Sequence, residues 1–245
     1  MSYAALQADP DLIGYWKLDE DSSATAADQT ATGNDGLNAA SSIREAGPNE
    51  FVPYSYQFSP GGFSNVRFEN PATSFTGGAN PRTYAFWAKI TSADGSDGLV
   101  TLGNELVISV YDLDTESPLL DINFFYHRVR GPAVLEEGEW FHVAIRVPVG
   151  ATSTSDVEAF INGAEVTLST SSGSPQELNT TFGTFTRFGL GSGYLTGNLA
   201  EFFSFDRALT DEEIMMLVTG GGGGDSAGPR RIHRLGLGGN LGVRR

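Results

Sequence analysis

The chain has 245 residues, 40% of them hydrophobic, which is enough to build an all-β domain with its own core. It contains no cysteine, so disulfides, thiolate zinc sites and cysteine nucleophiles are excluded. Thirty acidic side chains against fifteen basic ones give a net charge of −15, the wrong sign for general binding to nucleic acid.

The first residues include neither a basic region nor an apolar region typical of a signal peptide. No apolar run approaches the roughly 20 residues that a membrane helix needs. We therefore expect synthesis in the cytoplasm without a signal peptide, no contact with a membrane, and a final place in a virion or another extracellular particle.

Charge divides the chain at residues 220–224, which are five consecutive glycines. Residues 1–219 carry ten basic and 29 acidic side chains, whereas residues 220–245 carry five arginines and one aspartate. Consecutive glycines are typical of a linker. The sequence therefore predicts an acidic domain over residues 1–219, followed by a glycine-rich linker and basic arm over residues 220–245.

Turn-forming residues separate short runs rich in Val, Ile, Phe, Tyr and Leu, the pattern of many short antiparallel strands. The predicted strands cover residues 12–18, 54–58, 65–68, 82–90, 106–111, 119–126, 140–147, 157–161, 164–168, 187–189 and 200–205. Asn162-Gly163 predicts a tight hairpin turn between two of them. Alternation over residues 140–147 gives one face with only Phe, Val and Ile.

One helix is predicted, over residues 210–218, because Thr210 and Glu213 have the spacing of a capping box before an apolar stripe. The fold class is therefore all-β. We expect a two-sheet antiparallel sandwich of eleven to fourteen strands with one short C-terminal helix and an extended basic tail.

Six blocks of the sequence resemble, in order, the laminin-G-like domains of the concanavalin A-like lectin/glucanase superfamily, in the form common in bacterial and phage proteins. They are residues 12–20 with 27–36, 56–66, 84–89, 138–144, 160–163, and 197–202 with 206–214. The resemblance implies a jelly roll and a non-catalytic recognition or packing module, without specifying its ligand.

Carboxylates that relatives place near a calcium site are replaced here by Ser64 or Asn65 and by Ala200. A hard cation needs six to eight oxygen ligands and negative charge. We therefore expect no cofactor and no metal in the family's usual place, although acidic loops elsewhere leave calcium open.

The strongest catalytic candidate is the run Asp112, Asp114 and Glu116, which resembles the acidic strand of related glucanases. Retaining hydrolysis needs carboxyl groups about 5–5.5 Å apart, and the following Pro118 favours a loop instead. We interpret His142 as a hydrogen-bonded structural residue. We therefore expect no catalytic residues and no enzymatic activity.

Three tyrosines near loops or strand ends are candidates for stacking on a sugar: Tyr194, Tyr111 and Tyr126. The alternative is that these rings pack in the core like most aromatics of a sandwich.

The basic arm combines charge with aliphatic side chains, so we expect it to dock on a protein partner, either a neighbouring copy or a capsid or tail protein. The predicted docking residues are Arg230, Arg231, Ile232, Arg234, Leu235, Leu237, Leu241, Val243, Arg244 and Arg245.

The leading interpretation is a non-enzymatic structural or recognition module of a large assembly, such as a decoration, cement or tail component of a phage virion, anchored by the arm. A free carbohydrate-binding, lectin-like protein is the first alternative, and a glycoside hydrolase is the second. A glycan is accordingly a second candidate partner.

Overall fold

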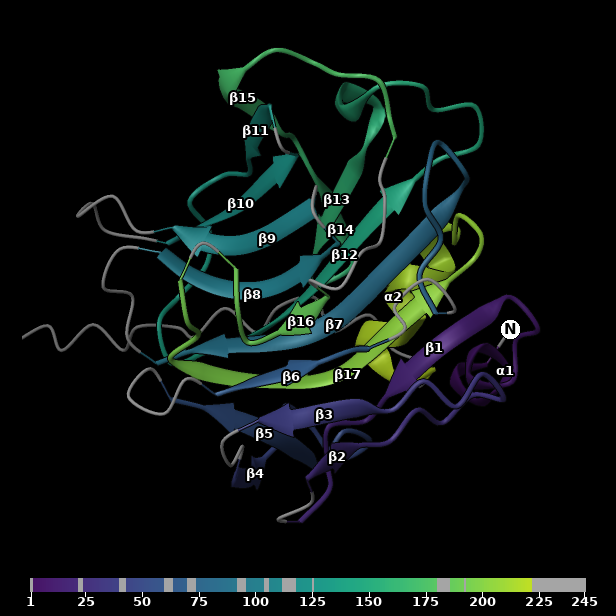
Figure 1. Cartoon of the computed structure of the whole chain (residues 1–245), viewed down its shortest axis with the longest axis vertical. Coiled ribbons are helices and arrows are strands. Elements are labelled where there is room, and N and C mark those ends of the chain that lie inside the picture. Colours follow the sequence, from purple (N-terminus) through teal and green to yellow (C-terminus); the bar gives the residue numbers. More distant parts are fainter. Residues whose placement is uncertain are drawn as a thin grey trace, which may run out of the picture.

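The computed structural model describes residues 2–21, 24–39, 43–59, 64–69, 74–91, 96–103, 106–111, 118–124, 126–179, 186–191 and 193–221. These residues form a sandwich of two antiparallel β-sheets, with two α-helices beside it (Figure 1). The predicted all-β jelly-roll class with a C-terminal helix is confirmed. The basic tail over residues 222–245 lies outside the described residues.

The first sheet has eight strands, in the order β14-β13-β12-β7-β17-β5-β4, and β1 pairs with β17 beside this path. Its strands are β1 (Leu12–Trp16), β4 (Ile43–Ala46), β5 (Tyr54–Phe58), β7 (Arg82–Ile90), β12 (Trp140–Val147), β13 (Glu158–Ile161), β14 (Ala164–Val166) and β17 (Gly197–Phe205). The central strands β7 and β17 are buried along almost their whole length.

The second sheet has nine strands, in the order β15-β11-β10-β9-β8-β16-β6-β3-β2. Its strands are β2 (Thr25–Ala26), β3 (Gly36–Ala39), β6 (Asn65–Arg67), β8 (Ser96–Leu102), β9 (Leu106–Tyr111), β10 (Leu119–Phe124), β11 (His127–Arg130), β15 (Ser169–Gly173) and β16 (Arg187–Phe188). The 3-10 turn η3 (Thr154–Asp156) precedes β13.

The main core fills the space between the two sheets and is rich in aromatic rings. Trp16 stacks on Phe75 with ring centroids 5.5 Å apart, and Phe188 stacks on Phe202 at 4.3 Å. The apolar face predicted for residues 140–147 belongs to this core. Burial of such large side chains is the main source of stability in a domain without disulfides.

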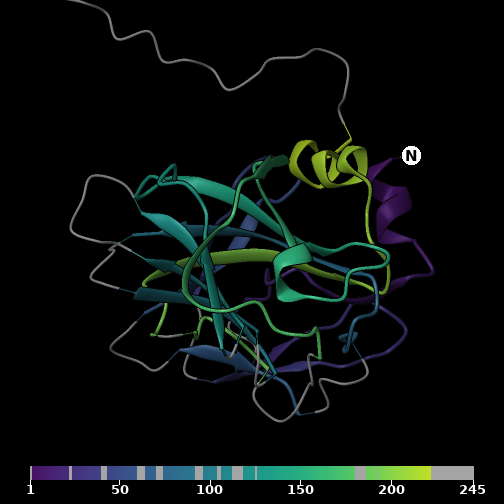
Figure 2. The same cartoon turned by 90° about the horizontal axis from the view of Figure 1, so that it is seen from above.

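Two helices cover part of the outer face of the eight-stranded sheet (Figure 2). Helix α2 (Asp211–Thr219) begins at the predicted capping box of Thr210 and Glu213 and ends at Gly220, whose φ of 65° is left-handed. Helix α1 (Tyr3–Gln7) packs beside it and beside β1. The outer face therefore has its own apolar cluster, which extends from Leu6 to Leu217.

The described residues form seventeen strands rather than the eleven to fourteen expected, because short and polar strands carry little apolar alternation. Sequence reasoning also missed α1. Asn162-Gly163 forms the predicted turn, with φ values of 52° and 78°. Within the described part of the chain, no helix is long and apolar enough to cross a membrane.

Candidate functional site

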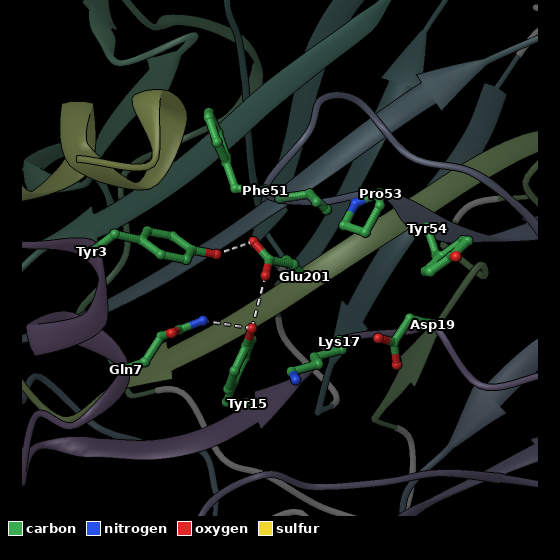
Figure 3. Close-up of a pocket in the computed structure, with 10 residues that line it drawn as sticks. Tyr3, Gln7, Tyr15, Lys17, Asp19, Phe51, Pro53, Tyr54 and Glu201 are labelled. Atoms are coloured by element: carbon green, nitrogen blue, oxygen red, sulfur yellow. Dashed lines mark hydrogen bonds between the residues drawn. The ribbon is translucent and has the colours of Figure 1, made fainter. Parts of the chain in front are cut away.

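A pocket of about 280 Å³ opens on the outer side of the eight-stranded sheet, where α1, β1, β17 and the segment before β5 meet (Figure 3). Its lining combines aromatic rings with charged side chains. The lining residues are Tyr3, Gln7, Tyr15, Lys17, Asp19, Phe51, Val52, Pro53, Tyr54 and Glu201. We call this group the Glu201 pocket.

Glu201 lies in the pocket because β17 is irregular at this point. The pairing of β17 with β7 shifts register between Ala200 and Phe203, and Glu201 has a left-handed φ of 46°. The Glu201 amide donates to the carbonyl of Lys17 at 3.1 Å, which ties the irregular segment to the end of β1. A left-handed backbone conformation is unfavourable in free energy for a residue other than glycine, and strained positions of this kind often occur at functional sites.

Both carboxylate oxygens of Glu201 accept hydrogen bonds from tyrosines. Tyr15 donates to Oε1 at 2.7 Å, Tyr3 donates to Oε2, and the Gln7 amide donates to the Tyr15 hydroxyl at 2.9 Å. Burial raises the pKa of Glu201 above its usual range, although the two hydroxyl donors oppose that shift. Burial and the nearby Glu201 charge raise the pKa of Tyr3 and Tyr15, so both stay protonated donors.

Two exposed rings stand at the rim of the Glu201 pocket. Phe51 is 37% exposed and Tyr54 is 42% exposed, and Pro53 lies between them. The Asn49 side chain accepts from the amides of Phe51 and Val52, which fixes this turn. Phe51 also lies 6.4 Å from Tyr3 between ring centroids, so the aromatic rim is continuous with α1.

Opposite charges occupy the remaining wall. Leu18 is fully buried with a φ of 57°, and its neighbours Lys17 and Asp19 both line the pocket. Burial, followed by the charge of Glu20, raises the pKa of Asp19, while Lys17 opposes that shift. The pocket thus offers an ammonium donor and a carboxylate acceptor beside apolar rings, the combination that binds polar ligands with apolar faces.

The structure places Tyr126 apart from Tyr111, and Tyr194 in a loop over the sheet that contains Tyr111. Tyr111 ends β9 on the outer face of the nine-stranded sheet and is half-buried. Tyr194 is half-buried and forms a β-bridge with Leu190. The loop that contains both residues packs closely over the same sheet, since a Cβ on Gly98 would lie 1.8 Å from the Gly191 nitrogen. Tyr126 is 67% exposed at the turn between β10 and β11, at the opposite end of β10 from the partner of Tyr111.

His142 corrects the sequence interpretation. The residue is fully buried on the outer face of the eight-stranded sheet, edge-on to Trp87 with ring centroids 5.2 Å apart. Neither ring nitrogen has a hydrogen-bond partner among the described residues, so it is structural but not hydrogen-bonded through its ring. Burial lowers its pKa to about 3, which keeps the ring neutral.

The remaining predictions concern the positions of replaced calcium ligands, the acidic run and the basic arm. Ser64, Asn65 and Ala200 are buried, and the described residues contain no group of three or more His, Asp or Glu side chains arranged to hold a metal ion. The acidic run over residues 112–116 and the docking residues of the arm lie outside the described residues.

Sequence reasoning missed the whole Glu201 pocket. Its residues come from three distant segments, residues 3–19, 51–54 and 201, and no local motif links them. One available signal was a glutamate within the apolar run of residues 197–205, where a carboxylate needs a buried partner.

A comparison with family models matches residues 60–215, more than half of the chain, to the laminin-G-like model described as the concanavalin A-like lectin/glucanases superfamily. The chain belongs to this superfamily. Glu201 falls inside the matched region, whereas the residues of α1, β1 and the aromatic rim precede it. No curated protein matches the chain.

Solved structures share the fold at low sequence identity. Domain 4 of AbnA, a GH43 extracellular arabinanase from Geobacillus stearothermophilus in complex with arabinotriose, matches with a TM-score of 0.61 and 16% identity over 85% of this chain and 98% of that chain. The binding domain of Paraclostridial Mosquitocidal Protein 1 matches with a TM-score of 0.60 and 14% identity over 85% of this chain and 52% of that chain.

Botulinum neurotoxin type C, whose cell entry depends on interaction with two ganglioside molecules, matches with a TM-score of 0.54 and 11% identity over 88% of this chain and 52% of that chain. The chain therefore spans nearly all of the arabinanase domain but about half of the two toxin chains. At these identities, the similarities establish the sandwich fold.

Proposed function

We propose that this chain is a carbohydrate-binding module and that the Glu201 pocket holds a sugar residue. The observation that carries the proposal is the pair of exposed rings, Phe51 and Tyr54, above a wall with a lysine and an aspartate. The fold is shared with domains described in complex with arabinotriose or as interacting with gangliosides, which supports a glycan as the ligand.

Binding would divide between the rim and the wall of the pocket. The apolar face of a sugar ring stacks on Tyr54 or Phe51, while Lys17 donates to hydroxyl oxygens and Asp19 accepts from hydroxyl groups. The guanidinium of Arg44 lies 4.4 Å from the Tyr54 centroid and holds that ring in place. A volume of about 280 Å³ suits one sugar residue rather than a long chain.

We propose that the module has no enzymatic activity. Each Glu201 oxygen already accepts a hydrogen bond from a tyrosine hydroxyl, so this carboxylate supports the pocket rather than attacking a substrate. A glycosidase assay tests the proposal on the ligand found by binding. No turnover is expected, and turnover abolished by Glu201→Gln or Glu116→Gln would identify an enzyme instead.

The decisive experiment is a glycan array with the purified chain, followed by titration of the best ligand. Tyr54→Ala and Phe51→Ala should each weaken binding about tenfold or more, because a stacked ring contributes on the order of 1–3 kcal/mol. Tyr126→Ala is the matched control, since Tyr126 is also exposed but lies at the turn between β10 and β11 of the other sheet. Loss of affinity with Tyr126→Ala alone would move the site to that turn.

We further propose that residues 220–245 anchor the module in a larger assembly, such as a phage virion or another extracellular particle. The support is the composition of this segment, which combines five arginines with five aliphatic residues after an acidic domain. Deleting residues 222–245 should leave a folded domain that is absent from purified particles by mass spectrometry. Full occupancy of the particle by the truncated protein would place the contact on the sandwich.

A further inference from the structure

A groove runs along the exposed side of α2, which lies at the surface of the molecule (Figure 2). It has a volume of about 450 Å³ and shares no lining residue with the Glu201 pocket. Asp211, Met215 and Thr219 line it at intervals of four residues, and Glu212 and Met216 repeat the interval one position later. Residues four apart lie on the same side of a helix, so the groove extends from the first residue of α2 to its last.

Two methionines form the apolar floor of this α2 groove. Met215 is 41% exposed, and a Cβ on Gly163 would lie 2.8 Å from its Cε, so the side chain packs directly on the hairpin turn between β13 and β14. Met216 is half-buried and packs against the apolar cluster on the outer face of the eight-stranded sheet. Methionine is flexible and adapts to the shape of an apolar partner. The floor of the groove therefore suits aliphatic side chains.

The start of the groove is negatively charged. Asp211 and Glu212 are both exposed, and 64% of the Asp211 side chain is open to solvent. Nη1 of Arg146 lies 2.7 Å from Oδ1 of Asp211, but the same guanidinium also pairs with Glu158 through Nε. The three carboxylates and the one arginine sum to a charge of −2. This end of the groove therefore attracts basic side chains.

The chain itself continues from the other end of the groove. Gly221 lines the groove and is the last described residue, so residues 222–245 begin there. This segment contains five arginines and five aliphatic residues, none of them before residue 230. The nine residues of α2 span about 14 Å, whereas the eight residues 222–229 can span up to about 26 Å. The arginines of the segment can therefore reach the acidic start of α2 in the same molecule.

We propose that, in the free module, residues 222–245 dock in the groove of their own α2. Their arginines pair with Asp211 and Glu212, and their aliphatic side chains pack on Met215 and Met216. A short flexible linker gives the tethered segment an effective concentration on the order of millimolar, which favours it over the same segment of a second copy. The inference rests on the anchoring role proposed above for the arm, and it adds that an assembly must displace the arm from α2.

The test uses the full chain, whose lack of cysteine allows a nitroxide spin label at a single introduced cysteine, Asn240→Cys. The chain has three methionines, so labelling their methyl groups with carbon-13 gives a simple spectrum that includes Met215 and Met216. The spin label should broaden both signals relative to its reduced, diamagnetic form. Diluting the protein tenfold should leave the broadening unchanged, because the contact is within one molecule. Absence of broadening would overturn the proposal.

A charge reversal in the groove separates docking from random contact of a tethered arm. Glu212→Lys should reduce the broadening by about threefold or more, because an attraction for arginine becomes a repulsion. Glu136→Lys is the matched control, since Glu136 is also exposed but lies in the segment between β11 and β12. Equal broadening in these two proteins would show that the arm does not use the acidic end of the groove, and the proposal would be wrong.

A mixed sample distinguishes one molecule from two. Chains that carry the spin label but no carbon-13 are mixed with chains that carry carbon-13 but no spin label, and we expect no broadening. Broadening in this sample would place the arm on a second copy and overturn docking within one chain. The particle experiment with residues 222–245 deleted tests the anchoring role separately, so failure of anchoring and failure of docking are distinguished.

Discussion

Glu201 accepts hydrogen bonds from the hydroxyls of Tyr3 and Tyr15, and only 5% of its surface is exposed to solvent. Glu201→Ala should therefore lower the free energy of unfolding by about 2–4 kcal/mol, because two hydroxyls lose their acceptor in a largely buried place. Glu201→Gln keeps one acceptor oxygen and should lose about half as much. Urea denaturation at neutral pH measures both values.

Glu212→Ala provides the control for this prediction, because Glu212 is exposed on α2. We expect it to change stability by less than about 0.5 kcal/mol. If Glu201→Ala had an equally small effect, the tyrosines would not depend on this carboxylate, and the support assigned to the pocket wall would be wrong.

His142 should make the protein sensitive to mild acid. Burial lowers its folded-state pKa from 6.5 to about 3, so the unfolded chain takes up a proton at a pH where the folded one does not. Its contribution to stability is complete above pH 6.5 and falls as the pH decreases toward 3, by up to about 1.4 kcal/mol per unit. His142→Leu should remove this part of the slope when unfolding is measured between pH 6.5 and 5.

His127 serves as the comparison for this pH dependence. Its ring nitrogens lie 2.8 Å from the Thr154 hydroxyl and 3.0 Å from the Thr170 hydroxyl, and burial also lowers its pKa. It stays in place in the His142→Leu protein. An unchanged slope after His142→Leu would show that the buried ring is not the group that titrates.

At the scale of elements, the end of α2 is coupled to the rim of the pocket. Gly220 has a left-handed φ, and a Cβ at this position would lie 2.7 Å from the Phe51 ring. Gly220→Ala should therefore cost about 1–2 kcal/mol for the backbone and more for the contact with Phe51. Thermal unfolding and affinity for the glycan ligand measure the two effects.

Gly138→Ala isolates the contribution of the contact. Gly138 also has a positive φ, of 81°, but a Cβ there would meet no atom within 4 Å. Gly138→Ala should therefore lose only the stability that an alanine in a left-handed conformation costs, and it should bind glycan normally. Equal losses in the two variants would mean that Phe51 moves aside freely and that α2 does not shape the rim.

Strands that the sequence predicts well are those with continuous apolar burial. Residues 82–90 and 140–147 match β7 and β12 at both ends, because both lie in the middle of a sheet. By contrast β15 is exposed along its whole length and consists of Ser, Thr and Gly, so only its pairing with β11 makes it a strand. Its existence depends on tertiary contacts that have no local signal.

The same limit explains why the candidate site was not predictable. Helix α1 has five residues and would not form alone, yet it brings Tyr3 to a carboxylate 198 positions away. The left-handed conformation of Glu201 likewise follows from the register shift in β17. Tyrosines could be chosen from the sequence as rings near strand ends, but their grouping depends on which segments the fold brings together.

At the scale of the whole molecule, we expect folding to be independent of calcium. By the family resemblance, Ser64 or Asn65 and Ala200 replace carboxylates that would add charge for the metal, and all three residues are buried. The melting temperature of the full chain should differ by less than about 1 °C between excess chelator and millimolar calcium. A rise of several degrees would indicate a native-state calcium site.

The pairing of β1 with β17 has a consequence for the order of events during synthesis. Leu12 pairs with Phe205, and β17 also joins β7 to β5 in the middle of the eight-stranded sheet. A ribosome synthesises β1 long before β17, so the early strands remain with unpaired edges and exposed aromatic rings until β17 is available. Nascent chains stalled before residue 197 should therefore be bound by chaperones or digested by protease, and protection should come in one late step once β17 has left the exit tunnel.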